Sequence, residues 1–514
     1  MKKLLIFALV LAMLLSTFVA CAPADPGNDI PGSEESSSQP AAVESSSTPT
    51  EDPETDPAEE SDEEINPLPD IDLGGKTIVI LSRNDPWMKD EVSVEKTNGD
   101  PINDSIFQRN VNVETALNIT LENTMVTGND YCVIDEIKVT ASDPNCPYHI
   151  AASSAYTCFE NTAAGYFHNI YDVGHIDLTK SYWSPKYNDE ASIGNAQYFV
   201  TGAVSLSLRR FIFVTFFNKS LADEYGLEDL YQVVNDGRWT IEYQTSIIGN
   251  MFKELDGVEG QTEGDAYGFL TDDQIFVDPY LASCDVKILV KDEDNFVKLD
   301  PETEKLDNMM KMVNDLFHRS GASFVFPRDG QYSQFTKILQ KFSSGEATMV
   351  SHRIYAAESD ELRSMETEYG IIPIPKYDED QDEYYSLAHD LFTVYGVVSA
   401  VNTLDLDNVG AVLEAMAIES HKVVTPAYYE VALKGKYSKD PQSWDMLDMI
   451  VNNLKINGGL LYTINLNDIT QKIRNMVRDD QSNASASVLG ALGRKSMERS
   501  LTAMINAIKA AQGE

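Results

Sequence analysis

The amino-acid sequence predicts an α/β fold built as two lobes, and three observations lead to this prediction. Strand-like and helix-like stretches alternate over residues 77–152, in the order typical of parallel βαβ units. A nearly unbroken apolar run at 211–217 suits a strand that is buried on both faces. About 440 residues remain after a leader and an acidic segment are set aside, which is more than one hydrophobic core usually serves.

The first elements of the body are expected in chain order. The apolar residues 77–81 predict a strand, and apolar residues recur on one face of a helix over 103–117. Alternation at 119–121 predicts a second strand, and a second helical pattern covers 131–140. A short apolar strand at 149–152 completes the strand-helix-strand-helix-strand order.

Helical patterns and short strands continue through the rest of the body. Thr240 has the side chain of an N-cap for a helix that runs to about residue 255. Short strands are expected at 348–350 and 369–375. Further helices are expected at 219–225, 308–318, 332–342, 409–419, 443–454 and 496–512.

The chain begins with the pattern of a secretory signal. Two lysines precede the apolar run 4–15, which is too short to cross a bilayer with ease. Cys21 directly follows Val-Ala, which is typical of the lipid acceptor in a bacterial lipobox. We predict a lipoprotein signal peptide at 1–20 and a lipidated, palmitate-bearing Cys21. Phe18 stands where such motifs usually carry Leu, so an ordinary signal peptide cut near Ala22 or slightly later is the alternative.

The segment that follows Cys21 predicts a tether. Residues 22–72 contain 16 acidic and no basic residues, with many Ser and Pro and few apolar side chains. Such a segment cannot bury enough apolar surface to offset the entropy of ordering it. We therefore expect 21–72 to be a disordered chain that holds the body off a membrane surface.

The overall charge limits the partners of this chain. The formal net charge is −43, from 39 basic and 82 acidic residues. A chain this acidic, without a basic stripe, repels nucleic acid, so we expect no nucleic-acid partner. It is also repelled by an anionic membrane surface, so we expect membrane contact through the lipid anchor only.

Motifs for metals, cofactors and catalysis are missing from the sequence. None of the five cysteines forms a CxxC pair, and no His stands at zinc spacing. Acids and glycines at 256–265 resemble a calcium loop but lack its required residue order. We predict no metal, no cofactor and no catalytic residue. Disulfides and buried free thiols both remain open for the last four cysteines, which are Cys132, Cys146, Cys158 and Cys284.

Eight short motifs occur in order along the body and together resemble one family. The motifs are DLGGKTI at 72–78, DPIND at 100–104, YWSP at 182–185, FNKSL at 217–221, DGRWT at 236–240, FSSGEA at 342–347, YGIIPIPK at 369–376 and TPAYY at 425–429. In this order they resemble the extracellular solute-binding proteins of bacterial ABC importers, the family 1 group that includes maltose-binding protein. The likeness is greatest to lipoprotein members of the clostridial type, and it covers about residues 72–514.

The resemblance implies a periplasmic-binding-protein-like fold of type II, with a ligand cleft between two hinge-linked α/β lobes. It places residues 73–205 and 340–395 in an N-terminal lobe, and residues 206–339 and 396–514 in a C-terminal lobe. It implies a monomer on the outer face of the cell membrane of a Gram-positive bacterium. Such a protein takes part in carbohydrate transport and hands its solute, here an oligosaccharide, to the membrane permease of the importer.

Ten residues are predicted to bind the ligand. A sugar site needs flat aromatic rings for the C–H faces and polar side chains for the hydroxyls. Most of the ten follow strands or lie at a crossing between lobes, where the resemblance puts the cleft. They are Asp85, Trp87, Ser154, Tyr156, Trp183, Arg209, Tyr280, Arg353, Tyr355 and Trp444.

Structural roles are the alternatives for these residues. Trp87 could serve loop packing, and Ser154 could cap the segment that follows it. Arg209 could pair with an acid across the hinge, and Trp183 could lie on a rim.

The same fold could also bind a peptide, a polyamine or an anionic small molecule. A secreted glycoside hydrolase is a further alternative, although no acid pair can be assigned from sequence because its separation depends on the fold.

Overall fold

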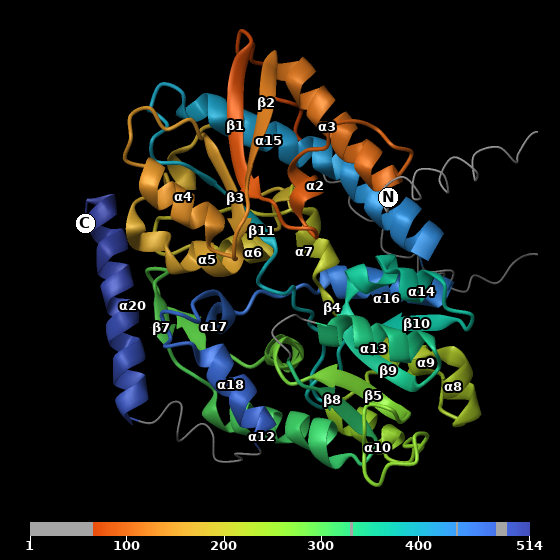
Figure 1. Cartoon of the computed structure of the whole chain (residues 1–514). Coiled ribbons are helices and arrows are strands. Elements are labelled where there is room, and N and C mark those ends of the chain that lie inside the picture. Colours follow the sequence, from red (N-terminus) through yellow and green to blue (C-terminus); the bar gives the residue numbers. More distant parts are fainter. Residues whose placement is uncertain (1–64, 329–332, 438–439, 480–490, 514) are drawn as a thin grey trace, which may run out of the picture. The chain divides into compact units, whose positions relative to one another are not determined.

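Two separate β-sheets organise the body of the chain (Figure 1). The computed structural model describes residues 65–328, 333–437, 440–479 and 491–513. The predicted signal peptide 1–20, Cys21 and all but the last residues of the predicted tether lie outside the described residues.

The first sheet contains the predicted βαβαβ unit and one added strand. Its order is β11-β3-β1-β2, with β1 parallel to β2 and to β3, and β11 antiparallel to β3. Leu81 lies opposite Ala151, and both side chains are buried in the core. The strands are β1 (Lys76–Arg83), β2 (Ile119–Val126), β3 (Ile150–Ser154) and β11 (Thr393–Val397).

Helices from the first part of the chain and one later helix, α15, surround this sheet (Figure 1). The long helix α3 begins after Asp100, whose side chain accepts hydrogen bonds from two backbone amides, and has Pro101 in its first turn. The helices are α2 (Lys89–Val92), α3 (Pro101–Leu117), α4 (Cys132–Thr140), α5 (Ala155–Glu160), α6 (Pro185–Ala191), α7 (Leu206–Arg210) and α15 (Leu406–Glu419).

The second sheet has five strands in the order β10-β4-β9-β5-β8. β5 is parallel to β8 and β9, whereas β4 is antiparallel to β9 and β10. All residues of β4 and β9 are buried, as the apolar run at 211–217 predicts for a central strand. The strands are β4 (Phe213–Asn218), β5 (Tyr267–Asp272), β8 (Ser323–Phe326), β9 (Ala347–Arg353) and β10 (Tyr369–Ile372).

Helices and a small hairpin complete the second part. Thr240 caps α10 as predicted, accepting a hydrogen bond from the amide of Tyr243 at 3.1 Å. The helices are α8 (Lys219–Glu224), α9 (Leu230–Asn235), α10 (Ile241–Ile248), α11 (Asp278–Ser283), α12 (Thr303–Asn314), α13 (Ser333–Ser343), α14 (Asp360–Arg363), α16 (Pro441–Asn452), α17 (Gly458–Leu461), α18 (Ile469–Arg478) and α20 (Ala491–Gln512); the hairpin strands are β6 (Leu289–Lys291) and β7 (Val297–Leu299).

Strand pairing corrects the expected division between lobes. The prediction assigned 340–395 to the first lobe, but β9 and β10 both pair with β4 in the second sheet. The prediction assigned 396–514 to the second lobe, but α15 packs against α3 beside the first sheet. An apolar strand buried on both faces fits the centre of either sheet, so its sequence does not specify its partner.

Two chain segments lie side by side where the polypeptide passes between the sheets. The amide of Phe213 donates to the carbonyl of Leu387, and the amide of His389 donates to the carbonyl of Phe211, both at 2.9 Å. The buried carboxylate of Glu91 ties this region to α2, since it accepts hydrogen bonds from the amide of Ser207 and from the Thr393 hydroxyl. The crossing is therefore a hydrogen-bonded pair rather than two independent linkers.

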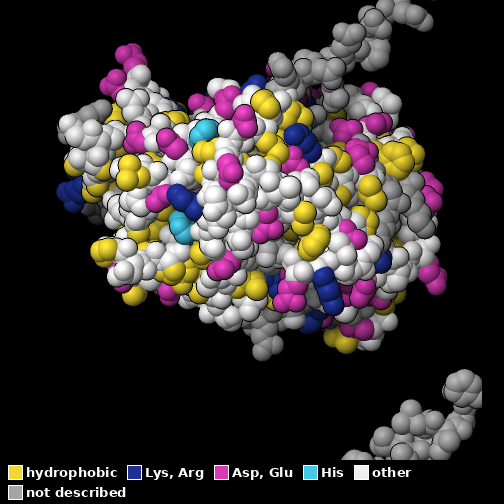
Figure 2. Space-filling view, turned by 90° about the horizontal axis from the view of Figure 1, so that it is seen from above, with side chains coloured by type: hydrophobic (Ala, Val, Ile, Leu, Met, Phe, Trp, Pro, Cys, Tyr) yellow, Lys and Arg dark blue, Asp and Glu magenta, His cyan; other side chains and the backbone are white. Residues whose placement is uncertain are grey.

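The charged surface and the cysteines can be compared with what the composition predicts. On the face seen in Figure 2, Asp and Glu side chains are spread widely over the described residues, and Lys and Arg do not gather into a patch. Within the described part of the chain, no helix has the length and apolar character needed to cross a bilayer. All four described cysteines are free thiols, and burial raises the pKa of Cys158 and Cys284 to about 12.

Glu414 is a buried acceptor at the centre of the first lobe. Glu414 is 2% exposed. Its carboxylate accepts hydrogen bonds from the Tyr182 hydroxyl at 2.5 Å and from Trp183 Nε1 at 2.7 Å. The amide of Asp177 donates to it as well, at 3.2 Å. A buried carboxylate needs such donors, because its desolvation is otherwise uncompensated. Glu414 therefore joins α15 to the YWSP segment.

Substituting Glu414→Gln should destabilise the protein by about 2–3 kcal/mol, because an amide NH₂ replaces an acceptor oxygen that faces N–H and O–H donors. Urea unfolding followed by circular dichroism measures this loss. Leu404→Ala is the control, since Leu404 is 89% exposed, and it should change stability by less than about 0.5 kcal/mol. Equal stability of E414Q and the unmodified protein would contradict the proposed role of Glu414.

Candidate functional site

A cavity of about 590 Å³ is lined by residues from both sheets. On the side of the first sheet, its lining residues come from the segments that follow β1, β2 and β3. These residues are Asp85 and Trp87 after β1, Asp130 after β2, and Tyr156 after β3. Because the carboxyl ends of parallel strands meet at one edge of a sheet, these loops converge.

The opposite wall comes from the second sheet and its helices. Asp272 and Arg353 stand at the ends of β5 and β9, and Phe335 projects from α13. Asp468 immediately precedes α18, and Arg474 lies one turn further into that helix. Parallel-strand ends and a helix start thus supply this wall.

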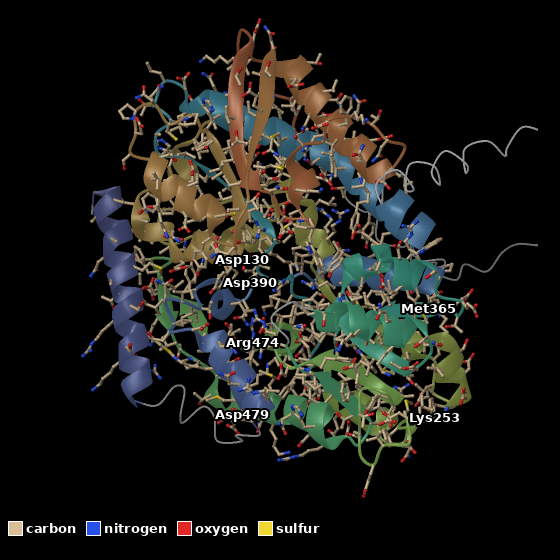
Figure 3. All side chains as sticks on the ribbon, in the orientation of Figure 1. Asp130, Lys253, Met365, Asp390, Arg474 and Asp479 are labelled. Atoms are coloured by element: carbon tan, nitrogen blue, oxygen red, sulfur yellow. The ribbon has the colours of Figure 1, made fainter. Side chains whose placement is uncertain are left out.

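The crossing segments supply the third wall. Phe211 lines the cavity from one segment, and His389, Asp390 and Leu391 line it from the other. Figure 3 shows Asp130, Asp390 and Arg474 in the middle of the body, far from the labelled Lys253 and Met365. A molecule in this cavity therefore touches both lobes and the connection between them.

Five of the ten predicted ligand residues lie at this cavity or beside it. Asp85, Trp87, Tyr156 and Arg353 line it. Tyr355 lines a neighbouring cavity of about 490 Å³, which shares Trp87 with the first. The Trp87 and Tyr355 rings meet edge to face with their centroids 4.9 Å apart, and Trp87 is 42% exposed. Trp87 therefore lines both cavities, and Tyr355 packs against it.

The structure places the other five predicted residues elsewhere, which corrects their expected position. Trp183 is 0% exposed and bonded to Glu414, so it belongs to the core of the first lobe. Tyr280 is buried in the second lobe, where its ring packs near Phe317.

Ser154, Arg209 and Trp444 also do not line the cavity. Ser154 is fully buried, with its hydroxyl 3.0 Å from that of Thr157. Arg209 lies on α7, and burial lowers its pKa. Trp444 lies on α16, which packs against β10. This cavity therefore gives no support to a ligand role for these three residues, which stays a prediction.

Several cavity residues were missed by sequence reasoning. Asp130 follows β2 as Trp87 follows β1, so the same strand-end argument could have found it. Asp468 and Arg474 carry no such signal, because only tertiary packing brings α18 to the cavity. Asp390 and His389 precede β11, whose pairing with β3 the sequence did not predict.

Arg474 and Asp278 form a buried ion pair at the base of the cavity. Arg474 Nε donates to Asp278 Oδ1 at 2.8 Å, and Nη2 donates to Oδ2. Burial raises the pKa of Asp278, and the neighbouring guanidinium partly offsets this effect. The pairing is bidentate, which is the strong geometry for a guanidinium with a carboxylate.

Asp390 is a buried acid in a crowded group of acids. Burial raises its pKa, Arg474 opposes the rise, Asp278 and Asp130 add to it, and the resulting pKa is about 7. His389 Nε2 lies 3.5 Å from Asp390 Oδ1, but burial and nearby arginines hold the pKa of His389 well below its ordinary value. A neutral imidazole therefore faces this acid.

Arg353 is held among aromatic rings. Its guanidinium carbon lies 4.7 Å from the ring centroid of Phe335 and 4.9 Å from that of Tyr355. The Trp87 and Phe211 centroids are each 5.7 Å away. Cations are attracted to the faces of aromatic rings, so these contacts stabilise the charge.

The arrangement suits a small polar molecule with apolar faces. Trp87, Tyr156, Phe211 and Phe335 offer rings, and the carboxylates and guanidiniums offer acceptors and donors. The volume lies within the range of small-molecule sites, roughly 300–1,000 Å³.

Comparison with known proteins identifies the fold. No protein-family model matches the chain, and no curated protein matches it. The cyclic α-maltosyl-1,6-maltose binding protein of Arthrobacter globiformis is 12% identical, with a TM-score of 0.52 over 84% of this chain and 99% of that chain. A family 1 extracellular solute-binding protein of Bifidobacterium longum subsp. infantis is 14% identical, with a TM-score of 0.50 over 84% of this chain and 100% of that chain.

The fold is that of the two-lobe solute-binding proteins. The predicted fold class is therefore confirmed. Both neighbours are named as binding proteins, and one of them binds a cyclic oligosaccharide by its name. The cavity lies between the two sheets, where the sequence predicted a cleft.

Without ligand, the variant Asp390→Asn should be more stable than the unmodified protein at pH 8 and equally stable at pH 4. The folded pKa, about 7, lies above the ordinary value of 3.8, so the folded state holds this proton more tightly. The stability that the proton contributes is complete below the ordinary value and is lost as pH rises toward 7. Asn carries no charge at either pH.

The expected result is a melting temperature for D390N about 2–4 °C above that of the unmodified protein at pH 8, and no difference at pH 4. Differential scanning fluorimetry at both pH values measures this. Asp223→Asn, on the exposed face of α8, is the control and should show no pH-dependent difference. An equal effect of D390N at both pH values would exclude the buried charge as its cause.

Proposed function

We propose that this protein is the substrate-binding subunit of an ABC importer, which captures a sugar or oligosaccharide and delivers it to a membrane permease. One observation carries the proposal: rings and charged groups from both lobes line one cavity in a solute-binding-protein fold. Asp85, Trp87, Tyr156, Arg353 and Tyr355 are the predicted ligand residues that this position supports.

The crossing segments explain how binding would change the lobes. Phe211 and His389 both line the cavity and also form the hydrogen-bonded crossing. A solute that contacts both lobes favours the closed arrangement, by the difference between its affinities for the two states. The closed form is the one that a permease would recognise.

The alternatives differ in ligand or in chemistry. A peptide, a polyamine or an anionic small molecule would use the same cavity without a sugar. A glycoside hydrolase would need a protonated acid, and Asp390 does hold its proton toward neutral pH. We favour a receptor without catalysis, because the fold neighbours are named as binding proteins.

Thermal shift against a panel of oligosaccharides, peptides and polyamines tests the proposal. A true ligand at about 100 times its Kd adds about 2.7 kcal/mol of stability and raises the melting temperature. The same mixtures, analysed by chromatography after incubation, should contain only intact oligosaccharide. A shift with peptides alone, or the release of shorter sugars, would contradict the proposal.

Tryptophan fluorescence gives a site-specific check with a matched control. Of the four tryptophans, only Trp87 lines the cavity, while Trp183 and Trp239 are buried in the core. Trp87→Phe should remove most of the fluorescence change on ligand binding and weaken affinity about tenfold, because stacking area is lost. Trp444→Phe, on α16, should keep both. A full response in W87F would contradict the assignment.

We further propose that the body is tethered outside the cell as a monomer, by a diacylated Cys21 and the segment 21–72. Two acyl chains give lasting anchorage where one gives only reversible binding. Cys21→Ser should abolish labelling by a palmitate analogue and release the protein into the medium. Cys146→Ser, which changes a free thiol of the body, should keep the label. Labelled C21S protein would contradict the anchor.

A further inference from the structure

Arg353 is the starting point, because its charge is buried beside the cavity. The residue is 4% exposed and lines the cavity. Its Nη1 lies 3.3 Å from His389 Nδ1, and its Nη2 donates to the Tyr355 hydroxyl at 3.1 Å. Its Nε is buried and has no hydrogen-bond partner. No carboxylate of the described residues lies within ion-pair distance of this guanidinium.

Three other arginines that are buried or partly buried have hydrogen-bonded partners within the chain. Arg474 is paired with Asp278, and Arg210 is paired with Glu358 at 2.9 Å. Arg109 donates to the backbone carbonyls of Glu91 and Val92. Arg353, by contrast, has only a neutral imidazole and a phenol as acceptors.

Burial of an unpaired charge is costly, and the surrounding rings offset only part of that cost. A cation–π contact contributes about 0.5–2 kcal/mol, whereas the effective desolvation of an ion amounts to several kcal/mol. Buried charges are therefore normally paired with an opposite charge. In this chain, the space that a counter-ion could occupy beside Arg353 is the cavity itself.

The geometry points to a ligand that brings its own carboxylate: we propose that the solute is an acidic saccharide, whose carboxylate pairs with Arg353. This inference rests on the proposed function, since it names the class of sugar for the same cavity. A guanidinium fork matches a carboxylate with two parallel hydrogen bonds.

His389 separates the cationic part of the cavity from the acidic part. Because Arg353 donates to Nδ1, the imidazole carries its proton on Nε2, and Nε2 faces Asp390. The anionic group of the ligand would thus lie at Arg353, one imidazole ring away from Asp390. Asp390, Asp130 and Asp468, which also line the cavity, would accept hydrogen bonds from sugar hydroxyls.

Matched sugars test the inference by isothermal titration calorimetry at pH 7. The probes are a galacturonate trimer, the same trimer with its carboxylates reduced to alcohols, and a galactosamine trimer. We expect the acidic trimer to bind at least about tenfold more tightly than the neutral one. Arg353→Gln should weaken the acidic trimer at least about tenfold more than the neutral trimer, and so remove the preference.

Two further variants keep the result interpretable if R353Q is unstable. Arg353→Lys keeps the charge but not the fork, so it should keep a reduced preference for the acid. Arg238→Gln changes an exposed arginine that pairs with Glu228, and it should keep the full preference. Melting temperatures of all variants are measured alongside the titrations.

The outcomes separate this inference from the function that it rests on. Tighter binding of the neutral or the galactosamine trimer by the unmodified protein would overturn the acidic ligand but leave a sugar receptor intact. An acidic preference that survives in R353Q would overturn the role of Arg353. Binding of none of the three trimers would overturn the acidic ligand, while the oligosaccharide panel in the thermal-shift experiment decides separately on the sugar receptor.

Discussion

The antiparallel pairing of residues 211–213 with 387–389 is the interaction on which the rest of the body depends. It holds together the two segments that pass between the sheets, through hydrogen bonds of 2.9 Å. The same segments carry Phe211 and His389 into the cavity wall. A solute in this cavity would contact the connection itself, which is the physical basis of the proposed link between binding and the relative position of the lobes.

Charges inside the body differ in how far the chain itself satisfies them, and at the cavity only some, such as the Arg474–Asp278 pair, are fully paired. Away from the cavity, Glu414, Glu91 and Arg109 are buried, and each is satisfied by donors or acceptors of the chain itself. At the cavity, Arg353 and Asp390 are only weakly satisfied by the protein. Since buried polar groups are normally hydrogen-bonded, this difference separates structural charges from groups that await a partner.

Sequence reasoning predicted local structure better than long-range pairing. The 3.6-residue pattern predicted α3 and α4, and strand-end logic placed Trp87 and Tyr156 correctly at the cavity edge, because both signals are local. β9 was assigned to the wrong lobe because the sequence of an apolar strand does not specify which strand it pairs with. Trp183 was misplaced because an aromatic ring serves equally as a core side chain or as a sugar platform.

The acidity of the chain and an acidic ligand are compatible because they act over different distances. The net charge of −43 acts on a distant anion, but salt at physiological strength screens exposed charges beyond about 8 Å. Arg353 is 4% exposed, and an ion pair formed with a buried group is screened much less than one on the surface. The long-range field slows the approach of an anion, whereas the contact with Arg353 governs how slowly the anion leaves. Selectivity for a carboxylate therefore depends on one local pair, not on the charge of the whole molecule.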